Sequence, residues 1–286
     1  LNKTQKLSAL PRLMNMIKYL FSGRPKGVLY VVDSEGNLIW YRHRGWQDGN
    51  ANWDNGGQGK IVGNGFFFEK MFAGAGNQFS AESILLPIYG INSNGDLMWY
   101  YHADSSNGSF KWEHGEGAKV GWVWSPFVNV FSSTNKNVIY GVHQNGQLWW
   151  YMHYGHCDGS FNWSNGGNHA VVGSGWNRYS NVIAGDWGII YGIDPNGDLM
   201  WYKHHGYDAG ILNWANGGVG VKVGTGWNMF THVVSAGDGI IYGIKPNGDL
   251  MWYKHFGADN GIAAAWSNGG SGFKVGNLHT DGKEIW

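Results

Sequence analysis

The chain carries one short motif five times, and this internal repeat restricts its possible folds more than any other feature. Trp-Tyr, followed two residues later by His, begins at Trp40, Trp99, Trp150, Trp201 and Trp252. The last four copies are spaced 51 residues apart, and the first two are 59 apart. A regular period of about 20–50 residues is typical of solenoids, propellers and arrays of small units.

Each copy of the motif lies among further landmarks that keep the same order. A Tyr precedes it in every unit: Tyr30, Tyr89, Tyr140, Tyr191 and Tyr242. A Trp follows it: Trp53, Trp112, Trp163, Trp214 and Trp266. A Val-Gly pair then closes the unit at Val62, Val120, Val172, Val223 and Val275. Landmarks that recur in one order indicate one supersecondary unit used five times.

The fourth unit shows what this supersecondary unit is. Residues 189–193 and 198–204 are rich in β-branched and aromatic residues, and Asn196-Gly between them favours a tight hairpin. Residues 220–224 and 230–236 add two more strands. On the second of these four segments Leu199 and Trp201 alternate with Met200 and Tyr202, so both faces are apolar. A strand buried on both faces fits a small sheet packed between two neighbours.

These patterns predict an all-β fold, a five-bladed β-propeller of four-stranded antiparallel blades. We expect a single domain over residues 1–286 with blades at about 14–64, 65–122, 123–175, 176–226 and 227–286. Residues 16–22 align with the inner strand at 229–235, so the first blade is complete in sequence order and needs no strand exchange. The extra residues around 74–83 predict a longer surface loop, and residues 281–286 either pair at the ring seam or begin further chain.

Composition narrows the partners of such a domain. The formal net charge is zero, 14% of residues are charged, and the five arginines are scattered, so nothing favours phosphate backbones or anionic membranes. Cys157 is the only cysteine, which excludes an intrachain disulfide and a Cys-rich zinc site. No run approaches the ~18 apolar residues of a membrane helix. We expect no cofactor, no metal, no nucleic acid and no membrane insertion; the oligomeric state stays open.

The block that joins one blade to the next resembles a known family. In unit four it runs from Trp214-Ala-Asn-Gly-Gly to Lys222-Val-Gly-Thr-Gly-Trp227 and an aromatic inner strand at Phe230. Over about residues 14–276 this pattern is similar to the tachylectin-type propeller lectins. The resemblance implies a five-bladed propeller that binds N-acetylated sugars, with one shallow site per blade or blade interface.

Lectin sites combine a flat aromatic face with a few amide or carboxylate groups, and four units offer both. The candidate sugar-binding residues are His43, Asp48, Trp53 and Asn55; His153, Asp158, Trp163 and Asn165; His204, Asp208, Trp214 and Asn216; and His255, Asp259, Trp266 and Asn268. Each has a structural alternative. The His closes a local hydrogen bond, the Asp caps a turn, Asn-Gly-Gly supplies turn geometry, and the Trp packs at the blade edge.

Three units depart from the pattern, so we expect three or four sites. Unit two has Trp112-Glu-His-Gly115 in place of the Asn-Gly-Gly turn, and its corner reads Gly121-Trp122 without an intervening Gly. Unit one has Phe66 for the corner Trp, and unit five ends Val275-Gly-Asn-Leu.

The sequence therefore predicts a multivalent, non-enzymatic lectin for N-acetylhexosamine-type (GlcNAc/GalNAc-like) or related cell-surface glycans. The alternative is a protein-interaction scaffold whose polar repeats are only structural. A sialidase-like or quinoprotein-like enzyme is weaker, because the arginines are few and Glu113, His114 and Glu116 are the nearest approach to a unique acidic island. A secreted or cell-surface location rests on the lectin interpretation and on the start at Leu1 rather than Met, which suggests that a preceding segment was removed.

Overall fold

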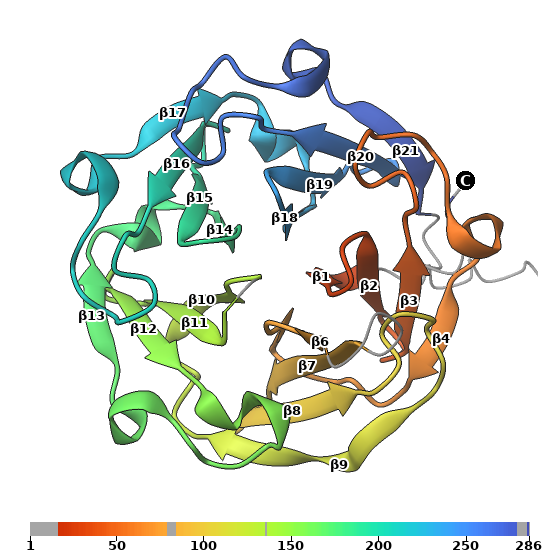
Figure 1. Ribbon diagram of the computed structural model, residues 1–286, viewed down its shortest axis with the longest axis vertical. Coiled ribbons are helices and arrows are strands. Elements are labelled where there is room, and N and C mark those ends of the chain that lie inside the picture. The colour runs from red at the N-terminus through yellow and green to blue at the C-terminus, as the bar shows by residue number, and fades with distance from the viewer. Residues whose placement is uncertain (1–16, 79–83, 135, 279–284, 286) are drawn as a thin grey trace, which may run out of the picture.

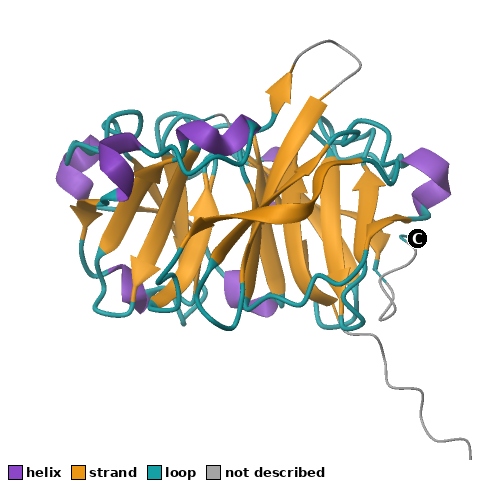
Figure 2. Ribbon diagram, turned by 90° about the horizontal axis from the view of Figure 1, so that it is seen from below, coloured by secondary structure: helices purple, strands orange, loops and turns teal. Residues whose placement is uncertain are grey.

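Five small sheets are arranged like the blades of a wheel around a central channel in the computed structural model (Figure 1). The structure describes residues 17–78, 84–134, 136–278 and 285. Seen from the side, the strands cross a flat disc, and the short helical turns lie near its edges (Figure 2).

Each sheet is antiparallel, and four strands follow one another from the channel outward. The blades consist of β1–β4 (Ile17–Gly23, Val28–Asp33, Leu38–Arg42, Lys60–Gly63); β5, β7, β8 and β9 (Lys70–Ala73, Ile84–Ile91, Leu97–His102, Trp112–Gly121); β10–β13 (Phe127–Ser132, Val138–His143, Leu148–Met152, Ala170–Gly173); β14–β17 (Asn181–Ala184, Ile189–Ile193, Leu199–Lys203, Val221–Gly224); and β18–β21 (His232–Gly237, Ile240–Ile244, Asp249–Lys254, Phe273–Asn277). The predicted five-bladed propeller is confirmed.

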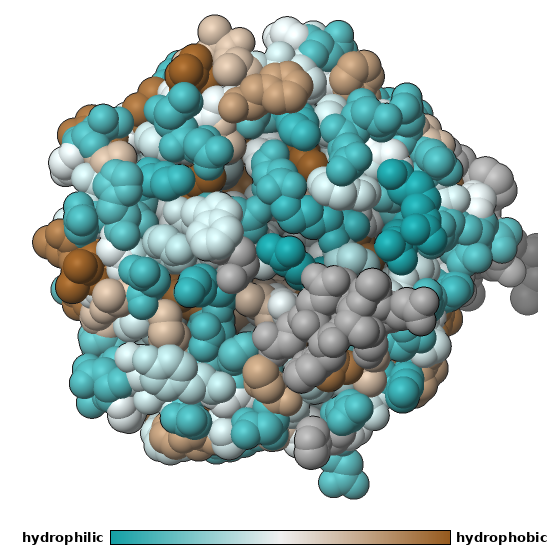
Figure 3. Space-filling model, viewed as in Figure 1, coloured by the Kyte–Doolittle hydropathy of each residue, from teal (hydrophilic) through white to brown (hydrophobic). Residues whose placement is uncertain are grey.

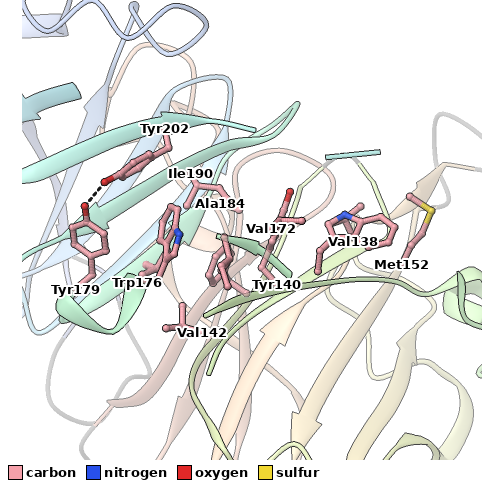
Figure 4. Packing of buried hydrophobic residues seen from close by; sticks show 14 residues of the cluster. Val138, Tyr140, Val142, Met152, Val172, Trp176, Tyr179, Ala184, Ile190 and Tyr202 are labelled. Atoms are coloured by element: carbon pink, nitrogen blue, oxygen red, sulfur yellow. Dashed lines mark hydrogen bonds between the residues drawn. The ribbon is translucent and has the colours of Figure 1, made fainter. Parts of the chain in front are cut away.

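The core lies between the blades. The second strand of each blade is nearly all buried and the third strand mostly so, and repeat Tyr and Trp residues pair across them, as Tyr191 does with Trp201. One cluster joins Tyr140 of the third blade to Trp176 and Tyr202 of the fourth (Figure 4). A blade on its own would expose both apolar faces to water, so closing the ring supplies the burial that stabilises it.

The third-strand Trp of each blade also donates a hydrogen bond to the next blade. The five indole Nε1 groups donate to backbone oxygens of Ser105, His156, Tyr207, Ala258 and Trp46, over 2.7 to 3.0 Å. A glycine of that next blade lies against each indole; at Gly210 an added Cβ would come within 2.4 Å of Trp150. The assignment of these tryptophans to the core is confirmed.

Every blade is built from one continuous stretch of chain, β1 included, so the ring closes without strand exchange. At the seam, Ile285 forms a bridge with Leu278 and donates its N–H to the Gly57 carbonyl over 2.8 Å. Of the predicted tail segment only Ile285 is described. This residue joins the fifth blade to the first.

The extra residues of unit two extend a hairpin beyond the disc. β6 (Asn77–Gln78) pairs with the start of β7, and residues 79–83 lie outside the described part of the chain. Figure 2 shows β6 and β7 rising above one face.

The inner strands surround a channel of about 170 Å³. Near it, the buried Asp186 carboxylate of the fourth blade accepts the Asp238 N–H at 2.9 Å and a hydrogen bond from the Thr134 hydroxyl. Arg24 and Lys26 of the first blade approach it to 3.8 and 3.7 Å. This carboxylate links four blades. Among the described residues, no helix has the length and apolar character needed to cross a membrane.

Candidate functional site

The repeat histidines are buried and fully engaged within the protein. Each Nδ1 lies 2.7 to 3.0 Å from the second-strand Tyr hydroxyl of the preceding blade, in the pairs Tyr242–His43, Tyr30–His102, Tyr89–His153, Tyr140–His204 and Tyr191–His255. Each Nε2 lies within hydrogen-bond distance of a backbone oxygen seven residues further on. Because a carbonyl only accepts, Nε2 carries the hydrogen and Nδ1 accepts from the Tyr hydroxyl.

This arrangement requires neutral imidazole. Burial lowers the pKa of His43, His153 and His204 to about 4, and it lowers the pKa of His102 and His255 in the same direction. Both ring nitrogens are occupied, so the histidines stabilise the blade interface and leave no ring nitrogen for a sugar.

The four predicted aspartates lie on the surface, and two of them shape a local turn. Asp48 and Asp158 each accept the backbone N–H two residues on, at 3.1 and 3.0 Å, while Asp259 lies 3.7 Å from the Lys203 ammonium. Asp208 is exposed as well. The glycine after Asp48 packs against Trp252 of the neighbouring blade.

The predicted Trp of each unit bridges two blades. Its Nε1 donates to the Val carbonyl of the preceding blade over 2.6 to 2.8 Å, in the pairs Trp53–Val275, Trp112–Val62, Trp163–Val120, Trp214–Val172 and Trp266–Val223. In the four units with predicted sites, one face of its ring stacks on the repeat His, with centroids 4.2 to 4.4 Å apart. These Trp residues therefore pack against the repeat His and also line the interface between two blades.

The predicted Asn residues begin a left-handed turn. Asn55, Asn165, Asn216 and Asn268 have φ between 51° and 53° and are exposed, and Gly-Gly continues each turn at positive φ. These four-residue turns are η1 (Asp54–Gly57), η3 (Ser164–Gly167), η5 (Ala215–Gly218) and η7 (Ser267–Gly270), and in each the Asn and the first Gly have left-handed backbone angles. Asn tolerates this conformation better than most residues with side chains, which explains its repetition.

A cavity of about 230 Å³ lies between this turn of the third blade and the end of the second. Two stretches of chain and two further residues, Tyr151 and Phe161, line this cavity. The stretches contribute Val120, Gly121, Trp122 and Trp124 on one side, and Trp163, Gly166, Gly167 and Asn168 on the other. Of the predicted residues it includes Trp163; His153, Asp158 and Asn165 do not line it. The Trp and the Asn-Gly-Gly turn thus meet the corner of the preceding unit.

The same aromatic trio recurs at two further interfaces. At the second-to-third interface Trp124 lies 4.8 Å from Tyr151 and 6.2 Å from Trp163, centroid to centroid. Trp176, Tyr202 and Trp214 repeat this geometry at the next interface, and Trp227, Tyr253 and Trp266 at the one after. Neither the corner Trp nor the Tyr of Trp-Tyr-x-His was among the predicted sugar-binding residues, although this Tyr repeats in all five units and the corner Trp in three.

The corner of unit two corrects one prediction. Its corner residue is the buried Trp124. The backbone N–H of Trp124 donates to the Gly95 carbonyl, as the backbone N–H of Trp176 donates to the Gly146 carbonyl. Val123 takes the position of the intervening Gly, at φ 66°. Trp122 is 57% exposed and is an extra aromatic residue.

Two interfaces differ from these three. Between the first and second blades the Asn-Gly-Gly turn is missing, because β9 extends to Trp112 and pairs with Tyr101 and His102. Between the fifth and first blades the turn is present, but Ile285 covers it. A Cβ added to Gly57, the counterpart of Gly167, would come within 2.0 Å of the Ile285 oxygen. Three interfaces therefore combine an uncovered turn with the aromatic trio.

Figure 3 shows that one face of the disc is largely hydrophilic, with apolar side chains gathered toward its rim. Among the described residues, no group of three or more His, Cys, Asp or Glu side chains is placed to hold a metal ion.

Comparison with known proteins places the chain in a family. The sequence model of one family, described as Tachylectin, matches residues 17–169 and 90–278. No curated protein sequence matches significantly.

Solved structures with likeness over most of the chain have low sequence identity to it. A mutant of Aleuria aurantia lectin in complex with alpha-methyl-L-fucoside is 17% identical, with a TM-score of 0.45, covering 91% of this chain and 80% of its own. AofleA from Arthrobotrys oligospora is 13% identical, with a TM-score of 0.45 and coverages of 84% and 69%. Human WBSCR16 is 12% identical, with a TM-score of 0.39 and coverages of 90% and 67%.

Proposed function

Because the chain belongs to the tachylectin family, we propose that it is a non-enzymatic, multivalent lectin that binds N-acetylhexosamine-type glycans at its blade interfaces. Family membership supports carbohydrate binding in general. The finer assignment rests on one observation, the cavity between the Asn-Gly-Gly turn of one blade and the corner of the preceding blade.

The cavity has the chemistry that an acetamido sugar requires. An acetamido group carries one donor, one acceptor and a methyl group. Gly121, Gly166 and Gly167, which can offer only backbone groups, line the cavity, and Trp124, Tyr151 and Trp163 form an aromatic wall. Apolar walls with a few polar groups are the usual composition of small-ligand sites. We place the sugar among these groups and assign the repeat His and Asp to the support of the interface.

Three sites follow from the three open interfaces, at the turns η3, η5 and η7. Each small site binds a monosaccharide weakly, but several sites on one disc raise the avidity for a glycan-covered surface by about 10²–10⁴ where the spacing allows simultaneous binding. Glycans are displayed on cell surfaces, so a secreted or cell-surface location belongs to the same proposal.

The second glycine of each turn provides a sharp test. Gly167 lines the cavity, and the nearest neighbour of a Cβ added there would be the Phe161 ring, 3.5 Å away. Gly167→Asn should therefore fill the site while keeping the left-handed backbone that Asn tolerates. A Cβ on Gly65, at φ 78° in the corner of unit one and away from the three open interfaces, meets nothing within 4 Å, so Gly65→Asn is the matched control.

The measurement is a titration with GlcNAc, GalNAc and glucose, followed by NMR of the indole N–H signals and by calorimetry. We expect three sites for an N-acetylhexosamine, weaker binding of glucose, and two remaining sites in Gly167→Asn but three in Gly65→Asn. Absence of binding at millimolar GlcNAc and GalNAc, together with a silent glycan array, would overturn the proposal in favour of the scaffold alternative.

A further inference from the structure

The corner of unit two departs from the repeat at two adjacent positions. Trp122 occupies the position of Ser174 in unit three and Thr225 in unit four, and Val123 occupies the position where both of these units have glycine. A β-branched residue at φ 66° is disfavoured, because left-handed backbone crowds its Cβ. With 57% of its surface exposed, Trp122 gains little burial in exchange. A local cost without gain in packing is characteristic of functional positions.

Trp122 forms an aromatic pair across the blade interface. Its ring stacks on Phe161 of the third blade, with centroids 4.8 Å apart and an interplanar angle of 13°. Phe161 is itself 51% exposed, and both residues line the cavity between the second and third blades. At the next interface the corresponding residues are Ser174 and Leu212, which offer no pair of rings.

The position of the pair at the cavity indicates the shape of its ligand. The cavity holds about 230 Å³, which suits a single sugar ring, while the two half-exposed rings add flat apolar surface beside it. A ligand that fills the cavity and also contacts the two rings has a narrow end inside the cavity and a further apolar face outside it. The end of a glycan chain has this form, because each sugar presents C–H groups on its faces.

We propose that the interface between the second and third blades is a two-part site. It takes a terminal N-acetylhexosamine in the cavity and the next sugar of the same chain against Trp122 and Phe161. This inference rests on the proposed function and makes this interface selective for disaccharides over monosaccharides. The interfaces at η5 and η7 bind the terminal sugar alone.

The test compares GlcNAc with its β1,4-linked dimer in a background where Gly218→Asn and Gly270→Asn block the other two sites. In this background we expect the dimer to bind about ten-fold more tightly than the monosaccharide, the gain expected from one aromatic contact. Trp122→Ser combined with Val123→Gly installs the Gly-Ser-Gly-Trp corner of unit three, so it should fold and abolish the preference.

A matched control uses Phe110, which is 62% exposed and is the unit-two counterpart of Phe161. Phe161→Ala should lower dimer affinity more than GlcNAc affinity, so that the preference for the dimer falls about ten-fold, whereas Phe110→Ala should leave the preference unchanged. If GlcNAc binds and the dimer binds no more tightly, the two-part site is wrong while the lectin proposal stands. If neither sugar binds, both fail.

Discussion

Acidification should destabilise this propeller well above the pH at which its carboxylates become protonated. The folded protein holds the pKa of His43, His153 and His204 at about 4, against about 6.5 in an unfolded chain. Between these values the unfolded state binds more protons than the folded one, so stability falls as pH falls. The contribution is complete above pH 6.5 and is lost progressively toward pH 4.

The size of the effect follows from these pKa values. Lowering the pH from 7 to 5 costs about 2 kcal/mol for each of the three histidines, hence about 5–6 kcal/mol together. His102 and His255 add to the loss, because burial lowers the pKa of both. Total stabilities of native domains are about 5–15 kcal/mol, so a large share is at risk near pH 5.

Guanidinium unfolding at constant ionic strength, followed by Trp fluorescence at pH 7, 6 and 5, measures this dependence. We expect a slope of about 3–4 kcal/mol per pH unit between pH 6 and 5. Carboxylates contribute below this window; Lys274 and Asn277 hold the pKa of Asp249 at about 2. His204→Gln should reduce the slope by about a third. Equal stability at pH 7 and pH 5 would refute the assignment of neutral, interblade histidines.

Two further substitutions test the interfaces at neutral pH. Tyr140→Phe removes the donor to the buried His204 Nδ1 and should cost about 1–3 kcal/mol of unfolding free energy in a denaturant titration, whereas no loss would mean that water replaces the hydroxyl. Gly57→Ala places a Cβ within 2.0 Å of the Ile285 oxygen, while Gly56→Ala has open space, so thermal unfolding should show a markedly lower Tm for the first than for the second; equal values would show that Ile285 does not hold the seam.

The fold was predictable because its signals are local. Asn196-Gly marks a hairpin within a few residues, and the alternation of Leu199, Met200, Trp201 and Tyr202 reports two buried faces without knowledge of any neighbour. Repetition then confirms each signal five times. Blade number and strand order follow from such patterns alone.

The site was less predictable because it forms between units. Trp163 donates to Val120, 43 residues earlier, and in a repeat every pair of equivalent landmarks keeps a constant separation whether or not the two touch. Constant spacing in the sequence therefore cannot distinguish the Tyr140–His204 contact from residue pairs that are not in contact. The repeated His looked like a ligand group for the same reason, since both roles conserve a polar residue within the repeat.

The division of labour between repeated and variable positions explains how one propeller can carry unequal sites. The Tyr–His and Trp–carbonyl bonds are needed at every interface for the ring to close, so those residues cannot change without loss of stability. Residues at the cavity mouth carry no such bond: Trp122, Ser174 and Thr225 differ freely at equivalent corners. Binding specificity can thus diverge at the rim of each interface, and the one corner that accepts a disfavoured Val123 backbone is the one that gained an aromatic pair.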